Sequence, residues 1–167
     1  VPAALFMSVT KTFFKVMAGG AKMPDQLLNA VNSELADNND SSMFVTVFCG
    51  ILDYKTGELF YANGGHLPPV IIRKDKEPNF IDMPNGMVLG ILGDYQFETA
   101  KITLQKTDKL LLYTDGVTEA MNYKNDLYSS ARLLNCMKRL SDKSIENMSK
   151  DLLKDVKVFT DGAPQSD

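Results

Sequence analysis

The residues best suited to chemistry in this 167-residue chain lie where an apolar run meets an acidic residue. The run Lys109–Tyr113 is followed directly by Thr114, Asp115 and Gly116. The run predicts a buried strand, and a carboxylate at the end of a rigid strand can be aimed at a metal ion or a substrate. An Asp-Gly pair is equally typical of an ordinary turn. One carboxylate does not specify a metal site, since hard divalent cations take several oxygen ligands.

Asp167 and His66 are two weaker candidates. Asp167 is the last residue and follows a polar run, which by itself is typical of a frayed terminus. His66 is the only histidine and follows Gly64-Gly65, so its simplest interpretation is a residue that fixes a turn. A His-rich metal site and a Ser-His-Asp arrangement are therefore poorly supported. Neither GxGxxG nor GxxxxGK[ST] occurs, so no glycine-rich phosphate loop is expected.

The composition narrows the class of protein. Lys and Arg number 18 against 21 Asp and Glu, giving a net charge of −3 without a basic block, which argues against nucleic acid as a partner. Hydrophobic residues make up 44% and charged residues 23%, as in ordinary globular proteins. Cys49 and Cys136 lie in apolar stretches without CxxC spacing, which predicts buried, reduced thiols and a cytoplasmic location. No apolar run is long enough to span a bilayer, so no membrane contact by this domain is expected.

The elements that must position the candidates follow the order helices, strands, helices. Periodicity predicts helices over residues 1–17, 24–36, 131–140 and 144–159, and strands over residues 43–52, 58–63, 70–73, 80–82, 96–104 and 109–113. In the first helix, Leu5, Val9, Phe13 and Val16 are expected to form the buried face. The strand 43–52 is continuously apolar, which predicts cover on both faces. The order of elements indicates an α+β fold with antiparallel pairing.

Four segments together resemble one family. They are VPAALFM (Val1–Met7), ANGGHLPP (Ala62–Pro69), LGI (Leu89–Ile91) and LYTDGVTEA (Leu112–Ala120). In this order they make the chain similar, over essentially its whole length, to the SpoIIE/RsbU-type branch of the bacterial metal-dependent serine/threonine phosphatases, the protein phosphatase 2C-like (PPM) family. Gly64 stands where that family usually has alanine. The resemblance implies an αββα sandwich, in which two antiparallel sheets are flanked by helix pairs, and one partial domain over residues 1–167.

The resemblance also implies a function and a metal site. The implied activity is removal of phosphate from phosphoserine or phosphothreonine on a regulatory protein of the anti-sigma-factor antagonist type, in stress or sporulation-like signalling. Asp115 matches the aspartate of the family's T-D-G motif, and Asp167 matches the first acidic residue of its C-terminal D-D/D-N motif. Both are therefore expected to bind Mn²⁺ or Mg²⁺ in a two-metal site, with no catalytic residue beyond the metal ligands. His66 is a weak candidate for substrate binding.

The ends of the sequence bear on this expectation. In the family, a Gly-Asp-x-Ser-Gly-type segment that supplies further ligands precedes the VPAALFM helix, and a final strand follows the position of Asp167. Since the sequence begins at Val1 and ends at Asp167, we expect a domain truncated at both ends, with low activity by itself and with sheet edges that favour a homodimer. Two alternatives stay open: a non-catalytic partner-binding or regulatory module on the same fold, and a metal-dependent hydrolase of another phosphoester.

Overall fold

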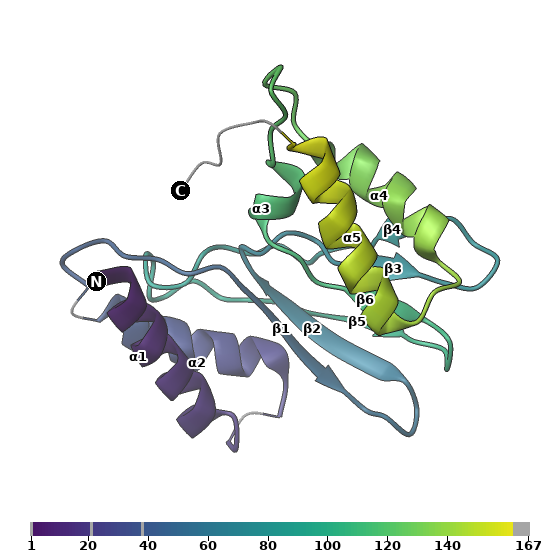
Figure 1. Cartoon of the computed structure of the whole chain (residues 1–167). Coiled ribbons are helices and arrows are strands. Elements are labelled where there is room, and N and C mark those ends of the chain that lie inside the picture. Colours follow the sequence, from purple (N-terminus) through teal and green to yellow (C-terminus); the bar gives the residue numbers. More distant parts are fainter. Residues whose placement is uncertain (1, 21, 38, 162–167) are drawn as a thin grey trace. The chain divides into compact units, whose positions relative to one another are not determined.

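The chain forms two compact units, each with its own sheet and helices. The computed structural model describes residues 2–20, 22–37 and 39–161. The first unit comprises residues 1–66 and 82–106, and the second comprises residues 67–81 and 107–167. Each unit contains a three-stranded antiparallel sheet (Figure 1).

The first unit is built from two helices and a sheet with the strand order β1-β2-β5. Its elements are α1 (Pro2–Met17), α2 (Pro24–Ala36), β1 (Val47–Leu52), β2 (Glu58–Gly64) and β5 (Thr99–Thr103). Helix α2 lies against β1 and β2 (Figure 1). The apolar side of α2 is buried, and its residues form one core with strand and loop residues: Leu27, Leu28, Val31, Leu35, Val45, Cys49, Ala62, Leu89 and Phe97.

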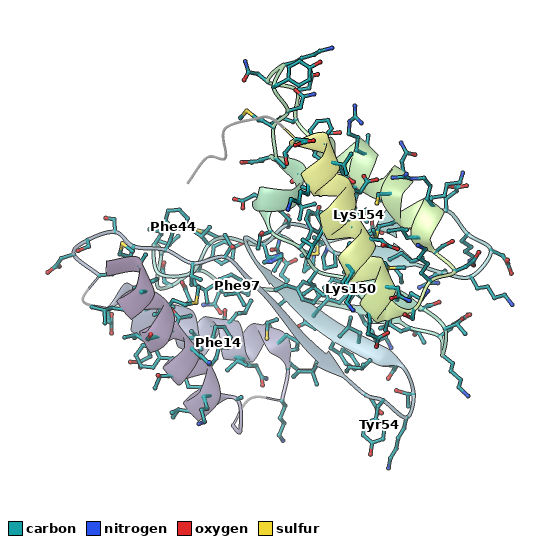
Figure 2. The ribbon with its side chains drawn as sticks, in the orientation of Figure 1. Phe14, Phe44, Tyr54, Phe97, Lys150 and Lys154 are labelled. Atoms are coloured by element: carbon teal, nitrogen blue, oxygen red, sulfur yellow. The ribbon has the colours of Figure 1, made fainter. Side chains whose placement is uncertain are left out.

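The predicted buried face of α1 is wrong except at Phe13, which packs against the core. Leu5, Val9 and Val16 are exposed, whereas Phe6 and Phe14 pack against the core together with Phe13 and Met17. Figure 2 shows Phe14 beside Phe97 in this unit. Helix α1 carries apolar residues on more than one side, and the larger aromatic side chains occupy the core because they remove more apolar area from water.

The β1–β2 hairpin is closed by a turn that its sequence specifies. The Asp53 side chain accepts hydrogen bonds from the backbone N–H groups of Lys55 (2.8 Å) and Thr56 (3.3 Å). Gly57 has a φ of +76°, and a Cβ there would lie 2.2 Å from the backbone oxygen of Leu104, so only glycine fits. Tyr54 extends into solvent at the turn (Figure 2).

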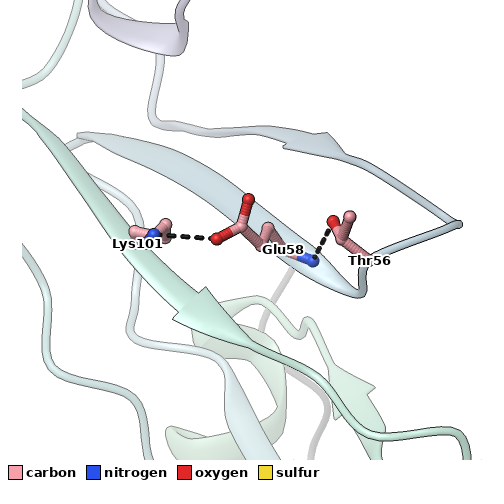
Figure 3. A network of polar contacts seen from close by, with 3 residues as sticks. All are labelled: Thr56, Glu58 and Lys101. Carbon is pink, nitrogen blue, oxygen red and sulfur yellow. Dashed lines mark hydrogen bonds and ion pairs between the residues drawn. The ribbon is translucent and has the colours of Figure 1, made fainter.

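A polar contact ties the second strand of this hairpin to the third strand of the sheet. Lys101 Nζ on β5 lies 2.8 Å from Glu58 Oε1 on β2, and the Glu58 N–H donates to Thr56 Oγ1 at 3.3 Å (Figure 3). Both partners of the ion pair are solvent-exposed to a large degree, so the pair helps to set the register and adds little stability.

Asparagine side chains on α2 hold the loop that carries the LGI motif. The amide of Asn32, which is buried, donates to the Leu92 carbonyl at 2.7 Å and accepts from the Gly90 N–H at 2.9 Å. Asn29 accepts from the Phe97 N–H at 2.9 Å. These bonds satisfy loop backbone groups that the packing removes from water.

The second unit contains a sheet with the strand order β4-β3-β6 and three helices. Its elements are β3 (Val70–Ile72), β4 (Asn79–Phe80), β6 (Lys109–Leu111), α3 (Asp115–Thr118), α4 (Ser129–Leu140) and α5 (Ile145–Phe159). Helix α4 contacts both α5 and β3. The buried core residues are Val70, Ile72, Tyr113, Tyr128, Leu133, Cys136, Met137, Met148 and Leu152.

Several strands are shorter than the sequence predicts. The strand expected over residues 43–52 begins at Val47, and Val45 makes one isolated bridge with Leu89. This strand is at an edge of its sheet, and Ile51 and Leu52 are exposed, so the expected cover on both faces is wrong. The strand expected over residues 96–104 covers Thr99–Thr103. Apolar runs mark where a chain is buried or interacts, but strand ends depend on the pairing partner.

The structure bears on the predictions about the cysteines and about membrane-spanning segments. Cys49 and Cys136 are buried and free, as predicted, and burial raises the pKa of both thiols. Within the described ranges, no helix combines the length and the apolar character that a membrane crossing requires.

Candidate active site

Asp115 lies at a junction between a strand and a helix in the second unit. Strand β6 ends at Leu111, and Asp115 is the first residue of the short helix α3, with Thr114 in an extended conformation before it. In the described part of the chain, β6 lies at the edge of its three-stranded sheet and pairs with β3 alone. Asp115 is exposed, so its carboxylate is open to cations from solvent.

Local hydrogen bonds orient Asp115. Its Oδ1 accepts from the backbone N–H of Gly116 at 2.8 Å. Its backbone oxygen accepts from the Glu119 N–H at 2.8 Å and from Thr118 Oγ1 at 3.4 Å. A Cβ on Gly116 would lie 3.6 Å from Thr114 Oγ1, an ordinary van der Waals contact, so the backbone here is not closely packed against another segment. The carboxylate is thus held on one side by its own backbone and is accessible on the other.

The segment before Asp115 is anchored in the core of the unit. Tyr113 is buried, which raises the pKa of its hydroxyl, and its ring lies 6.5 Å from that of Phe80. Lys109 Nζ donates to the backbone oxygens of Ser141 and Lys143, which lie in the connection between α4 and α5. The lysine thus satisfies carbonyl groups that no helix pairs. These contacts fix β6 and therefore the point at which Asp115 emerges.

His66 belongs to the first unit, where it ends the ANGGH segment after β2. Its backbone N–H donates to Asn63 Oδ1 at 3.0 Å, which directly supports its interpretation as part of a turn. Gly65 has a φ of +75°, and a Cβ on it would lie 2.8 Å from Val88 Cγ1. A Cβ on Gly64 would lie 2.5 Å from Leu89 Cδ1, so the glycine that departs from the family pattern makes room for the LGI loop. The role of His66 toward a substrate stays a prediction.

The prediction for Asp167 lies outside the described residues. In the part of the chain that the structure describes, no three His, Cys, Asp or Glu side chains are grouped so that they could share a metal ion. The donor chemistry of Asp115, an accessible carboxylate oxygen, fits Mn²⁺ or Mg²⁺. Asp115 therefore fits as one ligand of such an ion, and further oxygen ligands have to complete its coordination.

Two hollows lie between helices of the described residues, and neither is lined by Asp115 or His66. One, of about 250 Å³, lies between α4 and α5, and the other, of about 370 Å³, lies between α1 and α2. Charged side chains line the first, among them Arg139 and Asp155, whose Nη2 and Oδ1 atoms are 2.6 Å apart. Sequence reasoning missed this ion pair because both residues are ordinary polar positions of amphipathic helices.

Comparison with known proteins identifies the family. The model of the family "Stage II sporulation protein E (SpoIIE)" matches residues 1–167. The chain belongs to the SpoIIE family. It is 35% identical over 120 residues to phosphoserine phosphatase RsbU of Bacillus subtilis, an alignment that covers 71% of this chain and 36% of RsbU. The chain thus spans little more than a third of the length of this curated relative.

Solved structures show the same fold. The SiaA-PP2C domain of Pseudomonas aeruginosa matches with a TM-score of 0.83 and 16% identity, covering 100% of this chain and 67% of that one. The catalytic domain of the serine/threonine protein phosphatase PstP in complex with two manganese ions matches with a TM-score of 0.66 and 11% identity, covering 94% of this chain and 76% of that one. The predicted fold class, an α+β αββα fold of the protein phosphatase 2C type, is confirmed.

Proposed function

We propose that the protein containing this chain is a metal-dependent serine/threonine protein phosphatase, and that residues 1–167 form one partial domain of it. The observation that carries the proposal is Asp115, an exposed carboxylate whose backbone is fixed at a strand–helix junction, in a chain that belongs to the SpoIIE family. The naming of RsbU as a phosphoserine phosphatase supports phosphoserine as the group acted on. A regulatory phosphoprotein of the anti-sigma-factor antagonist type is the proposed substrate, and stress or sporulation-like signalling is the proposed context.

Asp115 and Asp167 are the proposed metal ligands. The manganese ions in the related PstP structure support Mn²⁺ as the cofactor, with Mg²⁺ as the alternative hard cation. When bound, such ions lower the pKa of water and neutralise phosphoryl oxygens. The chain's own contribution is to hold the Asp115 carboxylate in place through the Gly116 N–H. His66 is the proposed contact to the substrate, where an imidazole can hold a proton near the departing serine oxygen.

The number of carboxylates that match the family's acidic motifs bears on the phosphatase activity expected of this chain by itself. Asp115 and Asp167 are the two positions of this chain that match acidic family motifs, and a two-metal site requires more oxygen ligands than they supply. We therefore propose that this chain by itself binds Mn²⁺ weakly and turns over slowly. A cytoplasmic location is proposed from the two free, buried cysteines. The homodimer stays a prediction.

The test is Asp115→Asn in the full-length natural protein, with Asp142→Asn as the matched control. Asp142 is an exposed carboxylate between α4 and α5 of the same unit, so the control makes the same chemical change away from the junction. We expect Asp115→Asn to lower Mn²⁺-dependent hydrolysis of p-nitrophenyl phosphate at least about a hundredfold, since a neutral amide binds a hard cation weakly. Circular dichroism and Mn²⁺ calorimetry check the fold and the binding separately. Equal turnover by the two variants would exclude Asp115 as a ligand, whereas no Mn²⁺-dependent turnover by the wild type would favour the non-catalytic module.

A further inference from the structure

The segment from Glu119 to Tyr128, here named the 119–128 loop, connects α3 to α4 in the second unit. Its two ends are paired with each other: the Tyr128 N–H donates to the Ala120 carbonyl at 2.8 Å, and Met121 and Leu127 form an antiparallel bridge. In Figure 1 it is the green loop that extends beyond α3 before the chain enters α4. The loop begins one helical turn after Asp115.

The tip of the loop is organised by Asn122. Its Oδ1 accepts from the backbone N–H groups of Lys124 (2.8 Å) and Asp126 (3.0 Å), and its Nδ2 donates to Asp126 Oδ2 at 3.1 Å. Asn125 has a φ of +64°, in the left-handed region that asparagine tolerates best among residues with side chains. A loop with this many internal bonds presents its side chains in a defined arrangement.

The loop presents apolar side chains to solvent. Met121, Tyr123 and Leu127 are 49%, 68% and 46% exposed, and Lys124 Nζ lies 5.4 Å from the centre of the Tyr123 ring. Exposed apolar side chains gathered on one ordered segment are typical of interaction surfaces. Tyrosine and methionine are also enriched where proteins meet, and tyrosine contributes a large contact area at a low cost in conformational entropy.

We propose that the 119–128 loop contacts the folded body of the phosphoprotein substrate beside its phosphoserine, with Tyr123 as the main contact and Met121 and Leu127 at its sides. The inference rests on the proposed function. Continuity carries it: the Glu119 N–H bonds to the Asp115 backbone oxygen, so a protein whose phosphoserine reaches Asp115 lies next to this loop. A small aryl phosphate has no protein body for the loop to contact, so it serves as the substrate that does not depend on the loop.

The size of the surface also favours a transient substrate over a second copy of this chain. Three partly exposed side chains offer roughly a few hundred Å² of contact area, whereas a stable complex buries about 800 Å² on each partner. A substrate that must leave after every turnover needs only a small contact, and an ordered loop provides it without a folding cost.

The test compares two substrates with variants of the full-length natural protein. The substrates are p-nitrophenyl phosphate and the folded phosphoserine form of an anti-sigma-factor antagonist. We expect Tyr123→Ala to lower kcat/KM for the phosphoprotein about tenfold, as for a central aromatic contact, and to leave that for p-nitrophenyl phosphate within about twofold. Tyr123→Phe should restore most of the loss. Leu153→Ser removes an exposed apolar side chain from α5 of the same unit and should change neither value.

The outcomes separate the inference from the proposed function. Equal kcat/KM values for the phosphoprotein with Tyr123→Ala and wild type, or equal losses on both substrates, would overturn the inference and leave the phosphatase assignment in place. A shift in oligomeric state on size-exclusion chromatography with Tyr123→Ala would show that a second copy occupies the loop, which also overturns it. No Mn²⁺-dependent hydrolysis of p-nitrophenyl phosphate by the wild type would refute the proposed function, and the inference with it.

Discussion

The Tyr128 hydroxyl offers a sharp test of how the second unit holds the 119–128 loop. Tyr128 is 1% exposed, its hydroxyl donates to Asp155 Oδ2 on α5 at 2.6 Å, and its ring meets that of Phe159 edge-on at 5.4 Å. Tyr128→Phe removes the hydroxyl and keeps the ring, so the change removes the bond to Asp155, together with a weaker contact to the Cys136 thiol, and leaves the aromatic packing in place.

The expected loss of stability follows from the surroundings of Asp155. A hydrogen bond to a charged group contributes about 1.5–3 kcal/mol. Asp155 keeps Arg139 on its other oxygen and has a side chain that is 33% exposed, so water can replace part of the lost bond. The lower end of the range, about 1.5–2 kcal/mol, is therefore expected. At this chain length it corresponds to a fall in Tm of about 3–8 °C.

The loss should depend on pH. Burial favours a higher pKa for Asp155, but the hydrogen bonds from Tyr128 and Arg139 outweigh it and the pKa is lowered. A carboxyl with a lowered pKa in the folded state contributes stability above its unfolded pKa, about 3.9, and this stability is lost as the pH falls through the folded value. The difference between Tyr128→Phe and wild type should thus be complete at pH 7 and shrink below about pH 4.

Chemical denaturation at pH 7 and pH 3 measures both effects. Tyr54→Phe is the matched control, because Tyr54 is 84% exposed and its change should stay within about 0.5 kcal/mol. A double-mutant cycle with Asp155→Ala isolates the pairwise energy. A Tyr128→Phe variant as stable as Tyr54→Phe at pH 7, or a difference that is the same at both pH values, would refute this account of the bond.

Two further substitutions test the packing of the first unit. Asn32→Leu should lower the free energy of unfolding by about 2–4 kcal/mol, measured by denaturant, because it leaves the buried Gly90 N–H without an acceptor. Ser33→Ala on the same helix is the control and should leave this free energy unchanged. Equal free energies of unfolding for the two variants would contradict the role of the Asn32 amide. Gly86→Ala should cost about 1–3 kcal/mol, because a Cβ there would lie 2.0 Å from the backbone oxygen of Asn63. Gly19→Ala is the control, because no atom lies within 4 Å of a Cβ at Gly19. An unchanged Tm for Gly86→Ala would refute the close approach of Gly86 to the Asn63 backbone.

The sequence predicted the order and type of the elements better than their faces and ends. The pattern of α2 identifies its buried side, because Leu27, Leu28, Val31 and Leu35 fall on one stripe. In α1 the stripe through Leu5 and the stripe through Phe6 are both apolar, so spacing cannot choose between them. The choice is made by the sheet and loops that the helix packs on, which lie far away in the sequence.

In the candidate site, too, local features could be predicted from the sequence, whereas contacts between distant residues could not. Asp115 was found from its motif, since a T-D-G sequence after an apolar run is visible in the chain itself. The contact between Tyr128 and Asp155 was not, because the two residues are separated by 27 positions and nothing in either local sequence indicates the partner. Polar contacts between distant elements depend on how the helices pack, and this packing cannot be predicted from the local pattern of a single sequence.

Two buried tyrosines explain how an exposed site can still be ordered. Tyr113 precedes Asp115 by two residues and Tyr128 ends the loop that follows it, and both belong to the core of the second unit. The backbone between them is therefore held at both ends, and hydrogen bonds at Asp115 and Asn122 order it in between. A carboxylate held in this way can bind a cation without first losing backbone entropy, and an exposed tyrosine nearby can bind a protein at the same low cost. Loosening the Tyr128 anchor should for this reason weaken recognition of a phosphoprotein more than hydrolysis of a small phosphate ester.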